Sequence, residues 1–317
     1  MKEALEVLDQ VRLNFSSSAS LLLNITIAFI MFGVALEIKP EHFRDVVMKP
    51  KSVLLGVFSQ FFVLPFVTFL FVILLNPTPT VALGMILIAA CPGGNISNFM
   101  SAVAKANVAL SVSLTAVATL AATFMTPLNF AVWGKLYMDY YNKVDASTYL
   151  VPIEIHFWQT AKTVLILLGI PVVLGLLCTQ YLPKVTEKIK KPIRKTSIVV
   201  FIAFVIILLS ANFNNFLQYI HLIFIIVLIH NGLALGSGFT IGTLFKLPDI
   251  DRRTITIETG IQNSALALAL MFNPKIFDPD LALGGMTIIA AWWGVWHIIS
   301  GLSIASLWSK KRIPQTT

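Results

Sequence analysis

Charged side chains are scarce in this sequence. Asp, Glu, Lys and Arg make up 12% of its 317 residues, whereas 57% are hydrophobic. A soluble globular domain has about 25% charged residues. The composition therefore excludes a soluble domain and indicates an integral membrane protein, to which the size rules for soluble domains do not apply.

Cysteine and several signatures of catalysis are also scarce or absent. The two cysteines, Cys91 and Cys178, both lie in apolar runs, which argues against a disulfide framework. The sequence has no paired intramembrane aspartates, no His-Glu-x-x-His and no Gly-x-Ser-x-Gly, so we do not expect an enzyme. The net charge of +8 does not indicate nucleic-acid binding, because the basic residues lie in short loops between apolar runs.

The N-terminal segment, residues 1–17, lacks the continuous apolar stretch of a signal peptide and carries three acidic residues. Its apolar residues recur near helical spacing. This pattern predicts a short amphipathic helix on the membrane surface.

The rest of the chain is rich in apolar stretches, and about 20 apolar residues are enough to cross a bilayer as a helix. The sequence predicts an all-α membrane protein with nine transmembrane helices. The expected spans are residues 18–37, 52–75, 80–104, 108–134, 160–182, 197–216, 219–245, 254–272 and 281–308.

The loops between these spans predict the orientation. One set of loops, together with the tail 309–317, holds 17 of the 23 Lys and Arg residues. Cytoplasmic loops are the ones enriched in these residues. We therefore expect the N-terminus outside and the C-terminal tail in the cytoplasm, in a cell membrane that would be the inner membrane of a bacterium.

Two of the predicted spans contain helix-breaking or polar residues at their centres. The third contains Pro92-Gly93-Gly94, and the eighth contains Glu258 and Gly260 followed by two amides. Proline removes a backbone donor and glycine weakens the helix. We expect breaks near 92–95 and 258–263, and interrupted spans at matching places in two halves are typical of secondary transporters.

The first half, 18–135, has four predicted spans, and the second half, 160–308, has five. Spans one to four and spans six to nine show the same order and start on opposite sides of the membrane, so the sequence predicts an inverted repeat that leaves the fifth span over. Backbone carbonyls released at a break suit a hard cation such as sodium, whereas half-helix N-termini suit an anion. Glu258 is the only acidic residue well inside a predicted span. A lone intramembrane carboxylate is a functional hypothesis by default.

Other polar residues in the spans admit two interpretations. Ser111 and Thr115 lie on one helical face, but hydroxyls at this spacing commonly bond to the backbone one turn back. Gln60 is as compatible with a hydrogen bond between two helices as with a role in a binding site. His297 fits either a position in the aromatic belt or a substrate contact.

The segments CPGGNISN, NVALSVSLT, IETGIQNS, SQFFVLP and VWHIISG together resemble the bile acid:sodium symporter family. The motifs run in family order from about residue 28 to residue 305. The resemblance implies a core domain and a panel domain, with two discontinuous helices crossing in the core. The chain lacks the extra N-terminal helix of ten-span members, so it resembles the nine-span members.

The resemblance also implies two sodium sites and a substrate site. The first sodium site would use Ser97, Asn98, Ser111, Thr115 and Glu258. The second would use Gln60, Gln262, Glu258 and the backbone carbonyls of Thr259 and Ile261. Substrate contacts would come from Asn95, Ile96, Asn263 and His297, and bacterial members often have a small or hydroxyl residue at the position of Asn95.

The expected function is sodium-coupled uptake of an organic anion, either bile acid-like or a small carboxylate such as pantoate. Two Na⁺ ions, the anion and the lipid bilayer are the expected partners, with a monomer as the simplest assembly. The alternative is arsenite or proton-coupled efflux by the same superfold, in which Cys91 would act as a soft ligand. A buried cysteine is ordinarily a small hydrophobe, and the oxygen ligands favour sodium.

Overall fold

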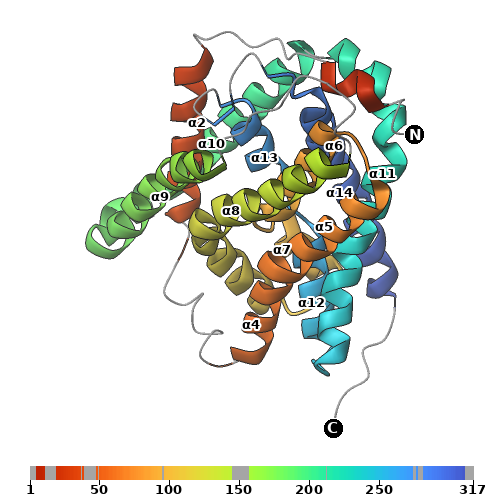
Figure 1. Cartoon of the computed structure of the whole chain (residues 1–317). Helices are drawn as coiled ribbons and strands as arrows, with labels where there is room; N and C mark the ends of the chain where they lie inside the picture. The colour runs from red at the N-terminus through yellow and green to blue at the C-terminus, as the bar shows by residue number, and fades with distance from the viewer. Residues whose placement is uncertain are drawn as a thin grey trace.

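The computed structural model describes residues 5–10, 19–36, 38, 48, 50–94, 96–144, 157–211, 213–273, 276–277 and 281–310. Over these residues the chain is helical throughout, with no strand (Figure 1). The elements are η1 (Val7–Gln10), α2 (Ala19–Ala35), α4 (Pro50–Phe58), η3 (Ser59–Val63), α5 (Leu64–Leu75), α6 (Pro79–Ala90), α7 (Ile96–Val103), α8 (Val108–Val144), α9 (Phe157–Tyr181), α10 (Pro183–Ala211), α11 (Phe213–Leu244), α12 (Asp249–Gly260), α13 (Ser264–Met271) and α14 (Gly284–Ser309).

Five helical stretches in the described chain are long and apolar enough to cross a membrane. They are Pro50–Leu75, Val108–Val144, Trp158–Tyr181, Leu217–Leu244 and Gly284–Ser309. Ile25–Ala35 and Pro79–Ala90 are shorter apolar helices. The chain is therefore an all-helical protein with several membrane-crossing helices, as its composition predicts.

Two predicted boundaries differ from the structure. Helix α8 continues to Val144, beyond the expected end of the first half, because Tyr137 and Tyr141 bury one face of the extension. Helix α10 already begins at Pro183, so the basic segment that we expected as a loop is part of a helix. Basic residues are good helix formers, and charge alone does not distinguish a loop from a helical end.

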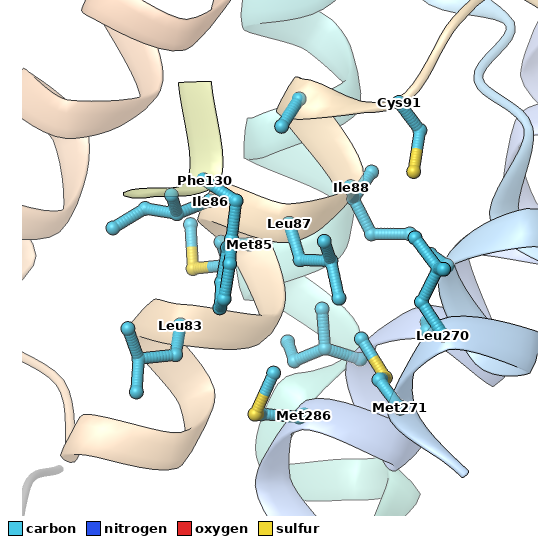
Figure 2. Packing of buried hydrophobic residues seen from close by; sticks show 14 of the residues in the cluster. Leu83, Met85, Ile86, Leu87, Ile88, Cys91, Phe130, Leu270, Met271 and Met286 are labelled. Carbon is cyan, nitrogen blue, oxygen red and sulfur yellow. The ribbon is translucent and has the colours of Figure 1, made fainter. Parts of the chain in front are cut away.

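Helix α6 lies at the centre of the main hydrophobic core, and every one of its residues is buried. Figure 2 shows Leu87 and Ile88 of α6 on the side that faces Leu270 and Met271 of α13, with Met286 of α14 nearby. The lack of a side chain at Gly84 and Gly285 allows α6 and α14 to approach closely, since a Cβ at Gly84 would lie 2.7 Å from the Met286 Cα.

Helices α2, α9 and α10 pack on one another at one side of the molecule (Figure 1). Helices α14, α8, α5 and α13 pack around α6, and α11 lies along α12. Ahead of all of them, residues 5–10 place Leu5 and Leu8 fully inside the protein, with η1 packed on α6 and α14. The apolar face of this N-terminal segment is therefore covered by protein in the described part.

Candidate functional site

The candidate site lies where two helix breaks cross. Helix α6 ends at Ala90 and α7 begins at Ile96, while α12 ends at Gly260 and α13 begins at Ser264. The two interruptions pair as a single antiparallel bridge between Gly93 and Gln262. The Gly94 N–H donates to the Ile261 carbonyl at 2.7 Å, and the Asn263 N–H donates to the Pro92 carbonyl at 2.9 Å.

This bridge satisfies backbone groups that the breaks release from the helices. Unpaired backbone groups in a membrane cost several kcal/mol each, so mutual pairing is one way to hold two breaks at one place. A further released group, the Gly260 carbonyl, accepts a hydrogen bond from the Asn231 side-chain amide at 2.8 Å. The Asn231 amide oxygen in turn accepts a hydrogen bond from the Ser300 hydroxyl.

The Glu258 carboxylate is the chemical centre of the crossing. It is buried on α12 and accepts hydrogen bonds from three hydroxyl groups on two other helices. Ser97 on α7 donates to Oε2 at 2.6 Å. From α8, Ser111 donates to Oε2 at 3.2 Å and Thr115 to Oε1 at 2.7 Å.

The structure therefore brings together four of the five residues expected for the first sodium site around one carboxylate. The fifth, Asn98, lies with its side-chain oxygen 3.3 Å from the Thr115 hydroxyl. Ser111 and Thr115 come from one helical face, as their spacing predicts. The Thr115 hydroxyl also lies 3.0 Å from the Ser111 carbonyl. It is therefore close both to the backbone one turn back and to the Glu258 carboxylate, so the two interpretations of this residue do not exclude each other.

A second polar cluster adjoins the first, on the other side of α12. The Gln60 amide donates to the Gln262 side-chain oxygen at 2.8 Å, and Gln262 donates back at 3.2 Å. Gln60 also donates to the Cys91 carbonyl at 2.9 Å, while Gln262 donates to the Thr259 carbonyl at 2.6 Å. The side chains and carbonyls expected for the second sodium site thus lie together, with the Ile261 carbonyl engaged in the bridge.

Gln60 lies in a π-helical turn, η3, between α4 and α5. Such turns insert a residue into a helix and occur frequently at functional sites. Ser59 in the same turn contacts the Thr259 hydroxyl at 2.9 Å. The sequence shows no residue that marks this turn, which is why our boundaries treat 52–75 as one regular span.

Cys91 shows no arrangement suited to a soft metal. It is fully buried, and its contribution to the site is its backbone carbonyl. Among the described residues there is no group of three His, Cys, Asp or Glu side chains that could hold a metal ion. The geometry around Cys91 gives no support to the efflux alternative.

A cavity of about 580 Å³ lies between α2, the crossing and α14. Most of its lining side chains are apolar. Polar groups enter it at the crossing and from α14 through Gln262, Asn263 and His297. The lining residues are Ile27, Ile30, Met31, Gly33, Val34, Pro92, Gly93, Gly94, Ile96, Thr119, Gln262, Asn263, Ser264, Ala265, Leu266, Ala269, Gly294, His297 and Ile298.

Three of the four expected substrate residues line this cavity, and the fourth, Asn95, is outside the described residues. Asn263 is the N-cap of α13, because its side chain accepts from the Leu266 N–H at 3.0 Å. His297 is buried, and its Nδ1 has no hydrogen-bond partner among the residues that the structure describes. Helices α7 and α13 both start at the cavity wall, with Ile96 and Ser264 among its lining residues.

Sequence reasoning missed several polar residues that support the site. They are Ser59, Ser101, Asn231, Asp251 and Ser300. Asn231 could have been found, since it is an amide inside the predicted span 219–245. The predicted spans put Asp251 in the loop between 219–245 and 254–272, whereas in the structure it is buried in the first turn of α12.

Comparison with known proteins gives similarities over most of the chain. A family profile described as the Sodium Bile acid symporter family matches residues 24–219. The sodium-dependent transporter YocS of Bacillus subtilis (strain 168) is 33% identical over 292 residues, covering 91% of this chain and 83% of that protein.

Plant and mammalian proteins are also similar. The probable sodium/metabolite cotransporter BASS2, chloroplastic, of Oryza sativa subsp. japonica is 30% identical over 288 residues, covering 86% of this chain and 64% of that protein. Sodium/bile acid cotransporter 4 of Mus musculus is 28% identical over 257 residues, covering 81% of this chain. The aligned region spans 56% of the length of the mouse protein.

Proposed function

Because this chain belongs to the Sodium Bile acid symporter family, we propose that it is a sodium-coupled symporter that takes up an organic anion by alternating access. The observation that carries the proposal is the convergence on Glu258. A single buried carboxylate and three hydroxyl groups from two further helices meet at a pair of crossing helix breaks. Oxygen ligands in number are what hard cations require.

The first sodium ion would be bound by Glu258 together with Ser97, Asn98, Ser111 and Thr115. Each hydroxyl now donates to the carboxylate, and rotating the hydroxyl hydrogen away turns the same oxygen toward a cation. The second ion would be bound by Gln60, Gln262, Glu258 and the carbonyls of Thr259 and Ile261. The reciprocal Gln60–Gln262 hydrogen bonds would be exchanged for bonds from both amide oxygens to the ion.

Two sodium ions against one carboxylate leave the site with a net positive charge. An anionic substrate would balance it, and two Na⁺ with one monoanion would carry one net positive charge inward. Moving one such charge across the membrane changes the free energy by about 2.3 kcal/mol per 100 mV of membrane potential. We therefore expect uptake to be electrogenic.

The substrate would bind in the cavity beside the crossing. The N-terminal ends of α7 and α13 border this cavity, and helix N-termini favour negative charge. Asn95, Ile96, Asn263 and His297 would contact the anion, while α2 contributes an apolar wall. This division suits an amphipathic anion, either bile acid-like or a small carboxylate of the pantoate type.

The proposed transport cycle uses two groups of helices as its moving parts. The core would comprise α4 to α8 with α11 to α14, and the panel would comprise α2, α9 and α10. The support is that α2 packs on α9 and α10 and that the cavity lies between α2 and the crossing. We further propose nine spans in an inverted repeat, with the N-terminus outside a cell membrane.

Thermal unfolding of the detergent-purified protein tests the sodium sites, since a ligand that binds the folded state raises its stability with concentration. We expect NaCl, but not KCl, to raise the melting temperature of the wild type. In Glu258→Gln, which keeps the shape and removes the charge, the sodium response should be lost. Asp139→Asn, at a half-exposed ion pair on α8, should keep it.

Equal responses to sodium and potassium in the wild type would refute sodium coupling. With sodium present, the same measurement identifies which organic anions bind. Uptake of a binding anion into proteoliposomes at a set membrane potential then tests the charge balance, and an inside-negative potential should accelerate it.

A further inference from the structure

We propose that Asp251 is a positioning residue for both sodium sites. Its buried carboxylate, on α12, joins the start of α8 and α4, about two helical turns from Glu258. Helices α12 and α8 carry Glu258, Thr259, Ser111 and Thr115, and α4 leads into the turn that carries Gln60. This inference rests on the proposed function, because it assigns Asp251 a role in the sodium affinity of that same site.

The Asp251 side chain makes one hydrogen bond through each carboxylate oxygen, and each bond reaches another element. The Ser52 hydroxyl of α4 donates to Oδ2 at 2.7 Å. The Asn107 side-chain amide, just before α8, donates to Oδ1 at 2.7 Å. Asp251 is 2% exposed and Ser52 is 4% exposed, so water competes little for these bonds.

The charge of Asp251 is compatible with this burial. Asp251 lies in the first turn of α12, where the helix dipole favours a negative charge. The neighbouring Arg252 and Arg253 both form ion pairs with Asp249. The hydrogen-bond donors to the Asp251 carboxylate are therefore neutral groups of other helices, so its bonds serve to hold those helices.

Asn107 links α12 to the start of α8 through several hydrogen bonds. Its backbone N–H lies 2.9 Å from the Thr254 hydroxyl and 3.2 Å from the Ile250 carbonyl. Its side-chain oxygen accepts from the Leu110 N–H at 3.1 Å, and its carbonyl accepts from the Ser111 N–H at 3.0 Å. Helix α8 thus begins at a point fixed on α12, one turn before Ser111.

The helical register connects these anchors to the ligands. Asp251 precedes Glu258 by seven positions, and Ser52 precedes Ser59 by the same number. Asn107 precedes Ser111 by four positions and Thr115 by eight. At about 1.5 Å per residue, the anchors lie roughly 6 to 12 Å along the helices from these residues.

The ligand distances leave little room for a shift of these helices. The three hydroxyl–carboxylate distances at Glu258 range from 2.6 to 3.2 Å, and a displacement of about 1 Å is enough to spoil a preorganised site. The Asp251 carboxylate accepts both donors at once, whereas an alanine at the same position accepts neither. The Asp251 side chain is thus required for both bonds.

Sodium titrations of thermal stability on the full-length protein test the inference. In Asp251→Ala, we expect the midpoint sodium concentration to rise about tenfold, as is typical when a group behind the metal ligands is changed. Anion binding at saturating sodium should stay close to wild type, because the cavity does not include this cluster. Asp249→Ala is the matched control, since it lies in the same turn and pairs with arginines, and its midpoint should remain at the wild-type value.

Ser52→Ala gives a second, milder test, because it removes the bond to α4 and leaves the bond to Asn107. We expect a smaller rise in the sodium midpoint and a lower Hill coefficient, since α4 leads to Gln60 of the second site. An Asp251→Ala protein that melts at a lower temperature but titrates at the wild-type midpoint would make Asp251 a structural residue only and overturn the inference. A wild type without any sodium response would instead refute the proposed function.

Discussion

At the scale of single residues, Gly93 packs closely against Glu258. A Cβ at position 93 would lie 2.9 Å from Glu258 Oε1 and 3.2 Å from the Glu258 carbonyl. The backbone of Gly93 does not adopt a positive φ, so another residue could take the same conformation. The absence of a side chain is needed here for space, because the backbone of one break touches the carboxylate of the other.

Gly93→Ala should therefore weaken sodium binding without preventing folding. We expect the sodium midpoint in thermal titrations to rise about tenfold, which corresponds to about 1.4 kcal/mol, because the added methyl group displaces the carboxylate. Gly94→Ala is the matched control, since a Cβ at position 94 would lie 3.4 Å from its nearest neighbour, the Gln262 carbonyl oxygen, which is an ordinary contact distance. Similar midpoints for both variants would show that the carboxylate tolerates the shift.

At the scale of elements, α12 is unusual because it is buried although its sequence, DIDRRTITIETG, is polar. It packs along α11, whose contact face includes Gly238 and Gly242. Small residues let two helices approach so closely that backbone and short polar side chains fill the interface. A Cβ at Gly238 would lie 2.6 Å from the Ile255 carbonyl, so this helix pair sets the depth at which Glu258 is held.

Replacement of Gly238 tests this packing. Gly238→Ala should destabilise the protein by about 1–3 kcal/mol, the range for overpacking a close interface, and lower the melting temperature without sodium. Gly236→Ala, on the same helix, should be neutral or slightly stabilising, because its Cβ would meet nothing within 4 Å and alanine favours a helix by about 1 kcal/mol. Equal melting temperatures for the two variants would contradict the close-packing argument.

At the scale of the whole molecule, the N-terminal segment connects the start of the chain to helices far along the sequence. Leu5 and Leu8 are buried, and η1 packs on α6 and α14. Asp9 accepts hydrogen bonds from the backbone N–H and the hydroxyl of Thr80, in the first turn of α6. Burial raises the pKa of Asp9 above its ordinary value of 3.8, and the nearby Glu6 adds to this increase.

Docking of this segment should depend on pH in a direction that follows from the raised pKa. The docked carboxyl binds a proton more tightly than the undocked one. The proton-linked stabilisation is therefore complete below the ordinary pKa and is lost as the pH rises through the raised pKa. Protonated Asp9 still has an oxygen that accepts from Thr80.

Hydrogen exchange of residues 5–10 measures this effect. Relative to Asp9→Asn at the same pH, wild-type protection should increase as the solution is acidified from neutral. Glu6→Gln should keep this dependence, because Asp9 still titrates. A ratio of wild-type to Asp9→Asn protection that stays constant with pH would contradict the argument.

Much of this architecture could be predicted from local sequence features. Long apolar runs predict membrane helices because the bilayer requires them, and Pro92 with its two glycines predicts a helix break because of their backbone chemistry. The cost of an intramembrane charge points to Glu258 without any knowledge of its neighbours. The end of α8, the helical start of α10 and the π-helical turn at Gln60 were not predictable, since propensity and composition differ little across these boundaries.

The sequence by itself determined that the protein is a helical membrane protein, where two of its helices break, and which carboxylate lies at the centre. These properties follow from hydrophobicity and backbone chemistry, which act over one or two helical turns. The family resemblance implied which hydroxyl groups surround Glu258 and that Gln60 and Gln262 share a site. Only the tertiary structure decided the hydrogen bonds that these side chains make and that Asp251 joins α12 to α4 and to the start of α8. Those contacts depend on how closely α11, α12 and α6 approach their neighbours, and packing of this kind connects residues that the sequence separates by more than a hundred positions.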